Sequence, residues 1–140
     1  MTRFAVDADT ALRIVRESTA IPAAHSLVAP SVIRSQVLSA LYAAMRAGSV
    51  DEADARRELD RFAELKIRLL GDRVSRMTAW RIARQLDWAD PIPAEYLAVA
   101  SLQADALVTG DPGLRAGAEK MVPPVTVVPF EALTLPARAT

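Results

Sequence analysis

Two aspartates in this sequence each follow a short apolar segment that has the character of a buried strand. Phe4-Ala-Val leads into Asp7, and Leu107-Val-Thr leads, through one glycine, into Asp111. Acids at the ends of neighbouring strands suit a hard divalent cation, because Mg²⁺ and Mn²⁺ prefer oxygen ligands and keep several waters. Such a cation can bind a phosphate and activate a water molecule against a phosphodiester. The alternative is that each acid only caps the helix that follows its strand.

The elements that would position these acids are predicted from apolar runs, helical spacing and turn residues. We expect strands over 4–7, 26–29 (or an extended lead-in), 67–70, 106–109 and 125–128. We expect helices over 10–19, from Ser31 as N-cap to Gly48 as terminator, and over 52–65, 73–86, 94–103 and 112–121. Apolar strands that alternate with helices predict an α/β fold whose parallel sheet is covered on both faces. Ligands in such sheets bind at the carboxyl ends of the strands, so we expect Asp7 and Asp111 to share one crevice.

Composition limits the remaining possibilities. The chain has 140 residues, of which 51% are hydrophobic, which is enough for one domain with one core. Its 17 basic and 17 acidic residues give a net charge of zero, which excludes a strongly basic nucleic-acid coat but not a local basic patch. The absence of cysteine excludes disulfides and thiolate metal sites, and the single histidine, His25, excludes a site built on several histidines. We expect a surface or structural role for His25.

Four segments, taken together in their order and spacing, resemble the PIN-domain family, in particular the VapC-like toxins of bacterial toxin–antitoxin pairs. They are 5–9, 27–41, 94–100 and 107–111, the last of which contains Thr-Gly-Asp. The resemblance covers nearly the whole length. It implies one three-layer PIN-like domain over residues 1–140, with a central parallel sheet flanked by helices. It also implies a metal-dependent ribonuclease that uses Mg²⁺ or Mn²⁺ to activate a water molecule against RNA.

The resemblance also assigns four acid positions, of which two hold acids here. The first and last fall on Asp7 and Asp111, so these two are the expected catalytic and metal-binding residues. The second, a glutamate in the family, falls on Gln36, and the third, an aspartate, falls on Pro93. Fewer charged ligands predict weak divalent binding and slow or absent RNA cleavage. The resemblance therefore implies either a weakened ribonuclease toxin or a catalytically inactive PIN domain that binds RNA or protein.

Three nearby residues could add metal ligands. Asp9 either reaches the site or caps the helix that follows it. Glu95 either reaches the site or is a first-turn acid that the helix dipole favours. Gln36 either contacts the metal through its amide oxygen or is a polar residue at the edge of the core.

RNA contacts are predicted at Thr109, Arg73 and Arg76. Arg73 and Arg76 fall, with Arg84, within about 80° of one helix face at 100° per residue, a stripe that either holds phosphates or is simply solvated. Thr109 either orients a carboxylate or phosphate or is a satisfied strand-end hydroxyl. The apolar surroundings of two tryptophans favour core packing over stacking on bases; they are Trp80 and Trp88.

The expected partners follow from the resemblance and the apolar composition. They are RNA, a cognate VapB-like antitoxin and a second copy of the chain in a homodimer. No apolar run approaches the roughly 20 residues of a membrane span, and no signal peptide is visible, so we expect a cytoplasmic protein without a membrane partner.

Overall fold

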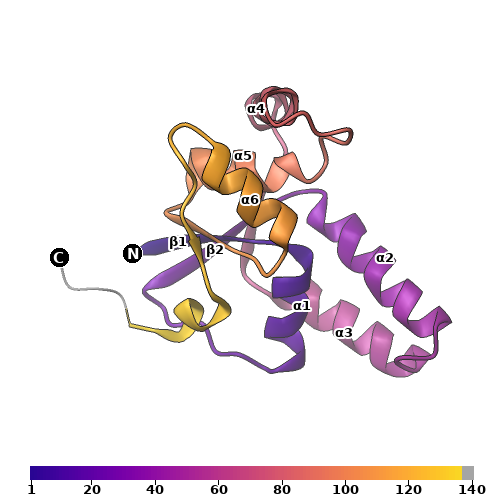
Figure 1. Cartoon of the computed structure of the whole chain (residues 1–140). Helices are drawn as coiled ribbons and strands as arrows, with labels where there is room; N and C mark the ends of the chain where they lie inside the picture. Colours follow the sequence, from indigo (N-terminus) through magenta and orange to yellow (C-terminus); the bar gives the residue numbers. More distant parts are fainter. Residues whose placement is uncertain (137–140) are drawn as a thin grey trace.

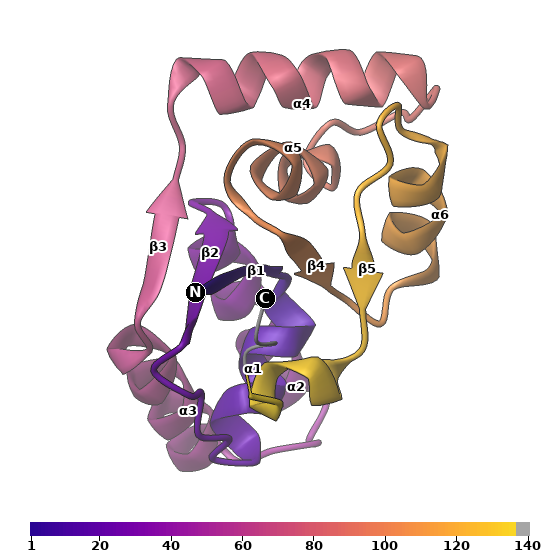
Figure 2. The same cartoon turned by 90° about the vertical axis from the view of Figure 1, so that its left-hand side faces the viewer.

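One five-stranded parallel sheet, in the order β3-β2-β1-β4-β5, organises the computed structural model (Figures 1 and 2). The structure describes residues 1–136, so the end of the predicted domain, residues 137–140, lies outside the described residues. The strands are β1 (Thr2–Val6), β2 (His25–Pro30), β3 (Ile67–Leu70), β4 (Ala106–Val108) and β5 (Val127–Val128). The helices are α1 (Ala8–Arg16), α2 (Ile33–Arg46), α3 (Glu52–Glu64), α4 (Arg73–Gln85), α5 (Ala94–Gln103), α6 (Pro112–Lys120) and the 3₁₀ helix η1 (Phe130–Thr134).

Helices cover both faces of the sheet. Helices α1, α2 and α3 lie on one face, and α4, α5 and α6 lie on the other (Figure 2). The central strands are buried on both sides, since Ala5, Val6, Leu107 and Val108 are at most 1% exposed. This double burial explains why their sequences are continuously apolar. The structure thus confirms the predicted three-layer α/β fold with a parallel sheet.

Several predicted boundaries differ from the structure, among them the end of the first helix, which is at Arg16 rather than residue 19, and the start of the last strand, which is at Val127 rather than residue 125. Two further differences concern β1 and α2. Strand β1 ends at Val6, and Asp7 is the N-cap of α1, which begins at Ala8 rather than at residue 10. Val32, not Ser31, is at the N-cap of α2, which has no side-chain cap. The Ser31 backbone instead continues the pairing of β2 with β3, because its N–H donates to the Leu70 carbonyl at 2.8 Å.

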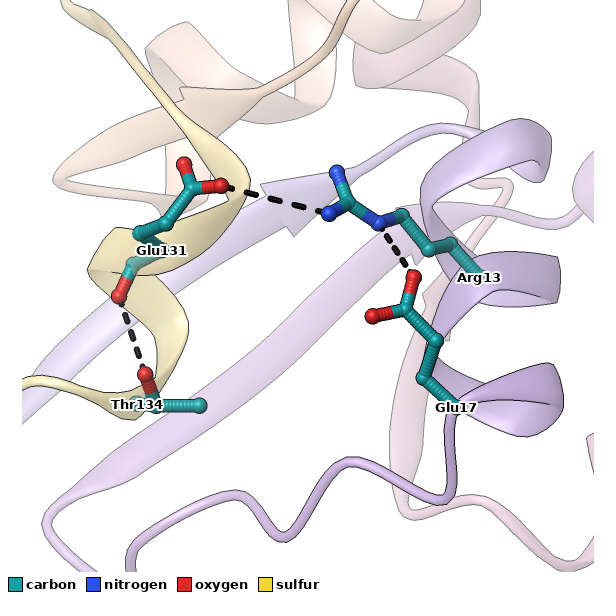
Figure 3. A network of polar contacts seen from close by, with 4 residues as sticks. All are labelled: Arg13, Glu17, Glu131 and Thr134. Atoms are coloured by element: carbon teal, nitrogen blue, oxygen red, sulfur yellow. Dashed lines mark hydrogen bonds and ion pairs between the residues drawn. The ribbon is translucent and has the colours of Figure 1, made fainter.

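The 3₁₀ helix η1, which the sequence patterns did not predict, is held against α1 by Arg13 (Figure 3). The Arg13 guanidinium lies 4.0 Å from the centre of the Phe130 ring, a cation–π contact. The same guanidinium pairs with Glu17 in its own helix and with Glu131 in η1. The Thr134 hydroxyl donates to the Glu131 carbonyl at 3.1 Å and closes the short helix.

His25 has a structural role at the start of β2. Its side chain is 8% exposed and packs edge-on against Phe4. Its Nε2 is hydrogen-bonded to the Leu135 carbonyl, which ties the segment after η1 to the amino-terminal end of β2.

The largest exposed apolar side chains on helices lie mainly on α2 and α4. Leu38 and Tyr42 are exposed on α2, and Trp80, 58% exposed, projects from α4. The prediction that Trp80 packs in the core is wrong, because α4 meets the rest of the molecule through the face that buries Ser75, Ala79, Ile82 and Ala83. Trp88 does pack against the core. No helix among residues 1–136 has both the length and the apolar character needed to cross a bilayer.

Candidate functional site

A pocket of about 310 Å³ opens where the strand order of the sheet reverses. Strands β2 and β3 extend the sheet on one side of β1, and β4 and β5 extend it on the other. Val6 and Val108 pair at the carboxyl ends of β1 and β4, which is the place where open α/β sheets bind ligands. The pocket is lined by Asp7, Ala8, Asp9, Gln36, Ala40, Pro93, Tyr96, Asp111 and Leu114. The two predicted acids therefore line one crevice, which we call the acidic pocket.

Asp7 is fixed in this pocket by two donors. Asp7 is 6% exposed, and its Oδ1 accepts from the Thr10 N–H at 2.9 Å. Its Oδ2 accepts from the Thr109 hydroxyl at 2.5 Å. The Thr109 oxygen in turn accepts from the Asp111 N–H at 3.0 Å. Thr109 thus orients a carboxylate, one of its two predicted roles, and links the two acids of the site.

Asp111 and Asp9 are the more exposed acids of the pocket. Asp111 caps α6, with Oδ2 accepting from the Leu114 N–H at 2.8 Å. Asp9 lies in the first turn of α1. The prediction of Asp9 as a cap is wrong, because Asp7 already occupies that position. Capping and pocket lining coincide at Asp7 and Asp111, since a helix starts directly after the strand end in each case.

Gln36 is half-buried, and its amide oxygen accepts a hydrogen bond from the Tyr96 hydroxyl. Burial raises the pKa of Tyr96 far above its ordinary value, and the negative charges of Asp7, Glu95 and Asp9 raise it further. Tyr96 is therefore a protonated donor. Sequence reasoning gave Tyr96 no role, although it lies three residues after Pro93 and so shares a helix face with that position.

Pro93 and Glu95 border the pocket differently. Pro93 is at the N-cap of α5 and lines the pocket without offering a ligand atom in its side chain. Glu95 is in the first turn of α5 and is not part of the pocket lining. Burial raises the pKa of Glu95, and the charge of Arg76 partly opposes this. Glu95 thus fits the helix-dipole alternative, while Arg73 and Arg76 lie exposed on α4 outside the lining.

The pocket offers oxygen donors of the kind that Mg²⁺ and Mn²⁺ prefer. Within residues 1–136, no three acidic or histidine side chains lie close enough together to hold a metal ion. Mg²⁺ is often held by one or two carboxylates, with waters and substrate phosphates completing its shell. The residues present fit such a sparse site, in which Asp7 and Asp111 would be the charged ligands.

Comparison with solved structures identifies the fold. The crystal structure of PAE2754 from Pyrobaculum aerophilum matches with a TM-score of 0.72 and 21% sequence identity, over 94% of this chain and 92% of that chain. VapBC2 from Rickettsia felis, solved bound to a DNA fragment from their promoter, matches with a TM-score of 0.57 and 9% identity. That match covers 91% of this chain and 98% of the other.

The fold is PIN-like. No protein-family model matches the sequence, and no curated protein does either. At 21% and 9% identity, the matches establish the PIN-like fold but no chemical activity. What the protein can do chemically depends on the residues that line the acidic pocket.

Proposed function

We propose that this chain is a VapC-type ribonuclease, the toxin of a toxin–antitoxin pair, with a weakened Mg²⁺- or Mn²⁺-dependent active site. The observation that carries the proposal is the convergence of Asp7, Asp9 and Asp111 on one pocket at the switch point of a PIN-like sheet. A divalent cation bound there would supply charge to neutralise an RNA phosphate and to activate water.

The protein's own residues would orient the ligands of that cation. The Thr10 N–H and the Thr109 hydroxyl hold the Asp7 carboxylate in place, and the Leu114 N–H holds Asp111. Each carboxylate oxygen has a second lone pair, so these hydrogen bonds leave capacity for a cation. Asp9 would add negative charge without a fixed position. Such a site binds weakly, because affinity for divalent ions depends on the number and charge of the ligands.

A second candidate function is a catalytically inactive PIN-like domain that binds RNA or protein. Two neutral residues in the pocket lining favour it. The oxygen of Gln36 is already engaged by Tyr96, and Pro93 has no ligand atom in its side chain. In that case Asp7 and Asp111 stabilise the fold as helix caps and have no catalytic role.

The proposed partners are RNA, a VapB-like antitoxin and a second copy of the chain. Support for the antitoxin comes from the fold shared with VapBC2. Support for the homodimer comes from the apolar side chains exposed on the surface of α2, which include Leu38 and Tyr42.

The proposal is tested by titrating Mn²⁺ and by measuring RNA cleavage with the wild type and the Asp7→Asn variant. The isosteric amide can still accept from the Thr10 N–H, and its NH2 group can donate to the Thr109 hydroxyl oxygen in place of accepting from it. One negative charge is lost, and circular dichroism checks that the variant is folded. We expect weak Mn²⁺ binding and slow, divalent-dependent cleavage, both reduced at least about tenfold by Asp7→Asn.

Asp60→Asn is the matched control, because Asp60 is exposed on α3, outside the acidic pocket. It should leave both properties unchanged. Strong Mn²⁺ binding that Asp7→Asn does not alter would overturn the proposed site. Absence of cleavage at any Mn²⁺ concentration would favour the inactive binding domain.

A further inference from the structure

We propose that a second pocket, at the carboxyl end of α4, binds one unpaired base of single-stranded RNA beside the acidic pocket. The pocket has a volume of about 350 Å³ and is lined by Trp80, Ala83, Arg84, Asp87, Trp88, Ala89 and Pro91. We call it the tryptophan pocket. The choice of RNA as ligand rests on the proposed function, whereas the pocket itself rests on the contacts described below.

The two tryptophans give this pocket one fixed wall and one exposed wall. Trp88 is half-buried and lies directly over Gly117 of α6, where a Cβ atom would come within 2.6 Å of the indole ring. Trp80 is 58% exposed. Aromatic side chains of this kind stack on the π-face of any base, which makes them sequence-tolerant platforms for single strands. The Asp87 carboxylate can also accept from the amino group of an adenine.

Helix α4 provides positive charge around Trp80. Between residues 73 and 85 it contains four arginines and no acid: Arg73, Arg76, Arg81 and Arg84. Among residues 1–136, no carboxylate lies within ion-pair distance of any of the four. At 100° per residue, Trp80 falls inside the sector of about 80° that holds Arg73, Arg76 and Arg84. Figure 2 shows α4 as the outermost element on its side of the molecule. The side chains of this sector are all exposed, so the face is open to a ligand.

The tryptophan pocket adjoins the acidic pocket along the chain. Pro91 lines the former, and Pro93 lines the latter. Two residues span at most about 7 Å of chain, so each pocket has a lining residue within about that distance of the other pocket's lining. A strand whose phosphate lies in the acidic pocket could therefore place a neighbouring base against Trp80 and Trp88, with its backbone along the arginines of α4.

Charge decides between RNA and a second copy of the chain as the occupant. Two α4 helices facing each other would bring eight arginines together without an acid from either helix. A polyanion instead gains affinity by releasing its counterions to such a surface. The chain as a whole has a net charge of zero, so the positive charge of α4 is a local feature of this surface.

The test measures binding of a fluorescently labelled oligoadenylate by anisotropy, in EDTA so that divalent ions play no part. Quenching of tryptophan fluorescence provides a second readout, because the chain has only two tryptophans. We expect Trp80→Ala to weaken binding by roughly 5- to 150-fold, the range of one lost base stack. Trp80→Phe, which keeps an aromatic ring, should retain most of the affinity.

Val74→Ala is the matched control, since Val74 is 60% exposed on the same helix but lies outside the tryptophan pocket. It should bind like the wild type. Arg84→Ala should weaken binding and lower its dependence on salt concentration. Circular dichroism and thermal melting check that each variant is folded.

Two results would overturn the inference: unchanged oligonucleotide binding by Trp80→Ala, and equal affinity of the wild type for duplex RNA. If Trp80→Ala leaves oligonucleotide binding unchanged but abolishes a dimer, the surface belongs to a second copy of the chain. Absence of cleavage with Mn²⁺, beside Trp80-dependent binding in EDTA, would remove the ribonuclease and support the base pocket. If Asp7→Asn abolishes cleavage but Trp80→Ala leaves oligonucleotide binding unchanged, the ribonuclease proposal is supported and the base pocket is overturned.

Discussion

Gln36 and Pro93 are neutral, whereas the PIN-domain pattern that the sequence resembles has an acid at each of these positions. The acidic pocket thus has two fewer negative charges than that pattern. Gln36→Glu combined with Pro93→Asp should therefore strengthen Mn²⁺ binding and raise RNA cleavage, each at least about tenfold. The Tyr96 hydroxyl, which now donates to Gln36, would donate to the new carboxylate. Aspartate at position 93 suits the N-cap of α5 and its dipole. Calorimetric titration and a cleavage assay measure the two effects.

The same two changes made far from the pocket supply the control. Gln103→Glu with Pro124→Asp adds equal charge and should change neither property. If instead Asp9→Asn abolishes activity and the Gln36 and Pro93 variant gains nothing, Asp9 already completes the site.

At the scale of elements, the packing of α6 depends on the glycine beneath Trp88. Gly117→Ala should gain about 1 kcal/mol of helix propensity and lose about 1–3 kcal/mol to overpacking, since the new Cβ would lie 2.6 Å from the ring. We expect the free energy of unfolding to fall by up to about 2 kcal/mol, measured by urea denaturation. Tryptophan emission should shift as the Trp88 ring moves.

Gly110→Ala is the comparison for this effect, because nothing lies within 4 Å of its Cβ position. It should change the stability by less than about 0.5 kcal/mol. A Gly117→Ala variant that is more stable than Gly110→Ala by about 1 kcal/mol, the full gain in helix propensity, would mean that the Trp88 ring yields without cost.

The order of strands and helices could be predicted because burial leaves a pattern along the chain. Apolar runs such as Leu107-Val mark strands covered on both faces, and the convergence of Asp7 and Asp111 follows from parallel strands whose carboxyl ends share one edge. Contacts between distant residues leave no such pattern. Tyr96 and Gln36 are 60 residues apart, and the exposure of Trp80 depends on which face of α4 meets α5.

At the scale of the whole molecule, the balanced charge of the chain favours self-association, because copies with a net charge near zero repel each other little. Leu38 and Tyr42 are more than half exposed on α2 and provide apolar surface for it. We expect light scattering to give twice the chain mass of 15.1 kDa. Leu38→Glu should lower that mass, whereas Ser39→Glu, an exposed neighbour, should not. A monomer at all concentrations would contradict the dimer.

The pairing of β1 with β4 also decides when the acidic pocket comes into being during synthesis. Phe4 pairs with Ala106, and the Arg3 N–H donates to Asp105, 102 residues further along the chain. Strands β1, β2 and β3 can associate as they leave the ribosome, but the wall of the pocket that Asp111 and Leu114 form does not yet exist. Pairing across such a separation is also slow. A nascent chain therefore lacks the pocket until synthesis has passed Asp111 and the sheet has closed.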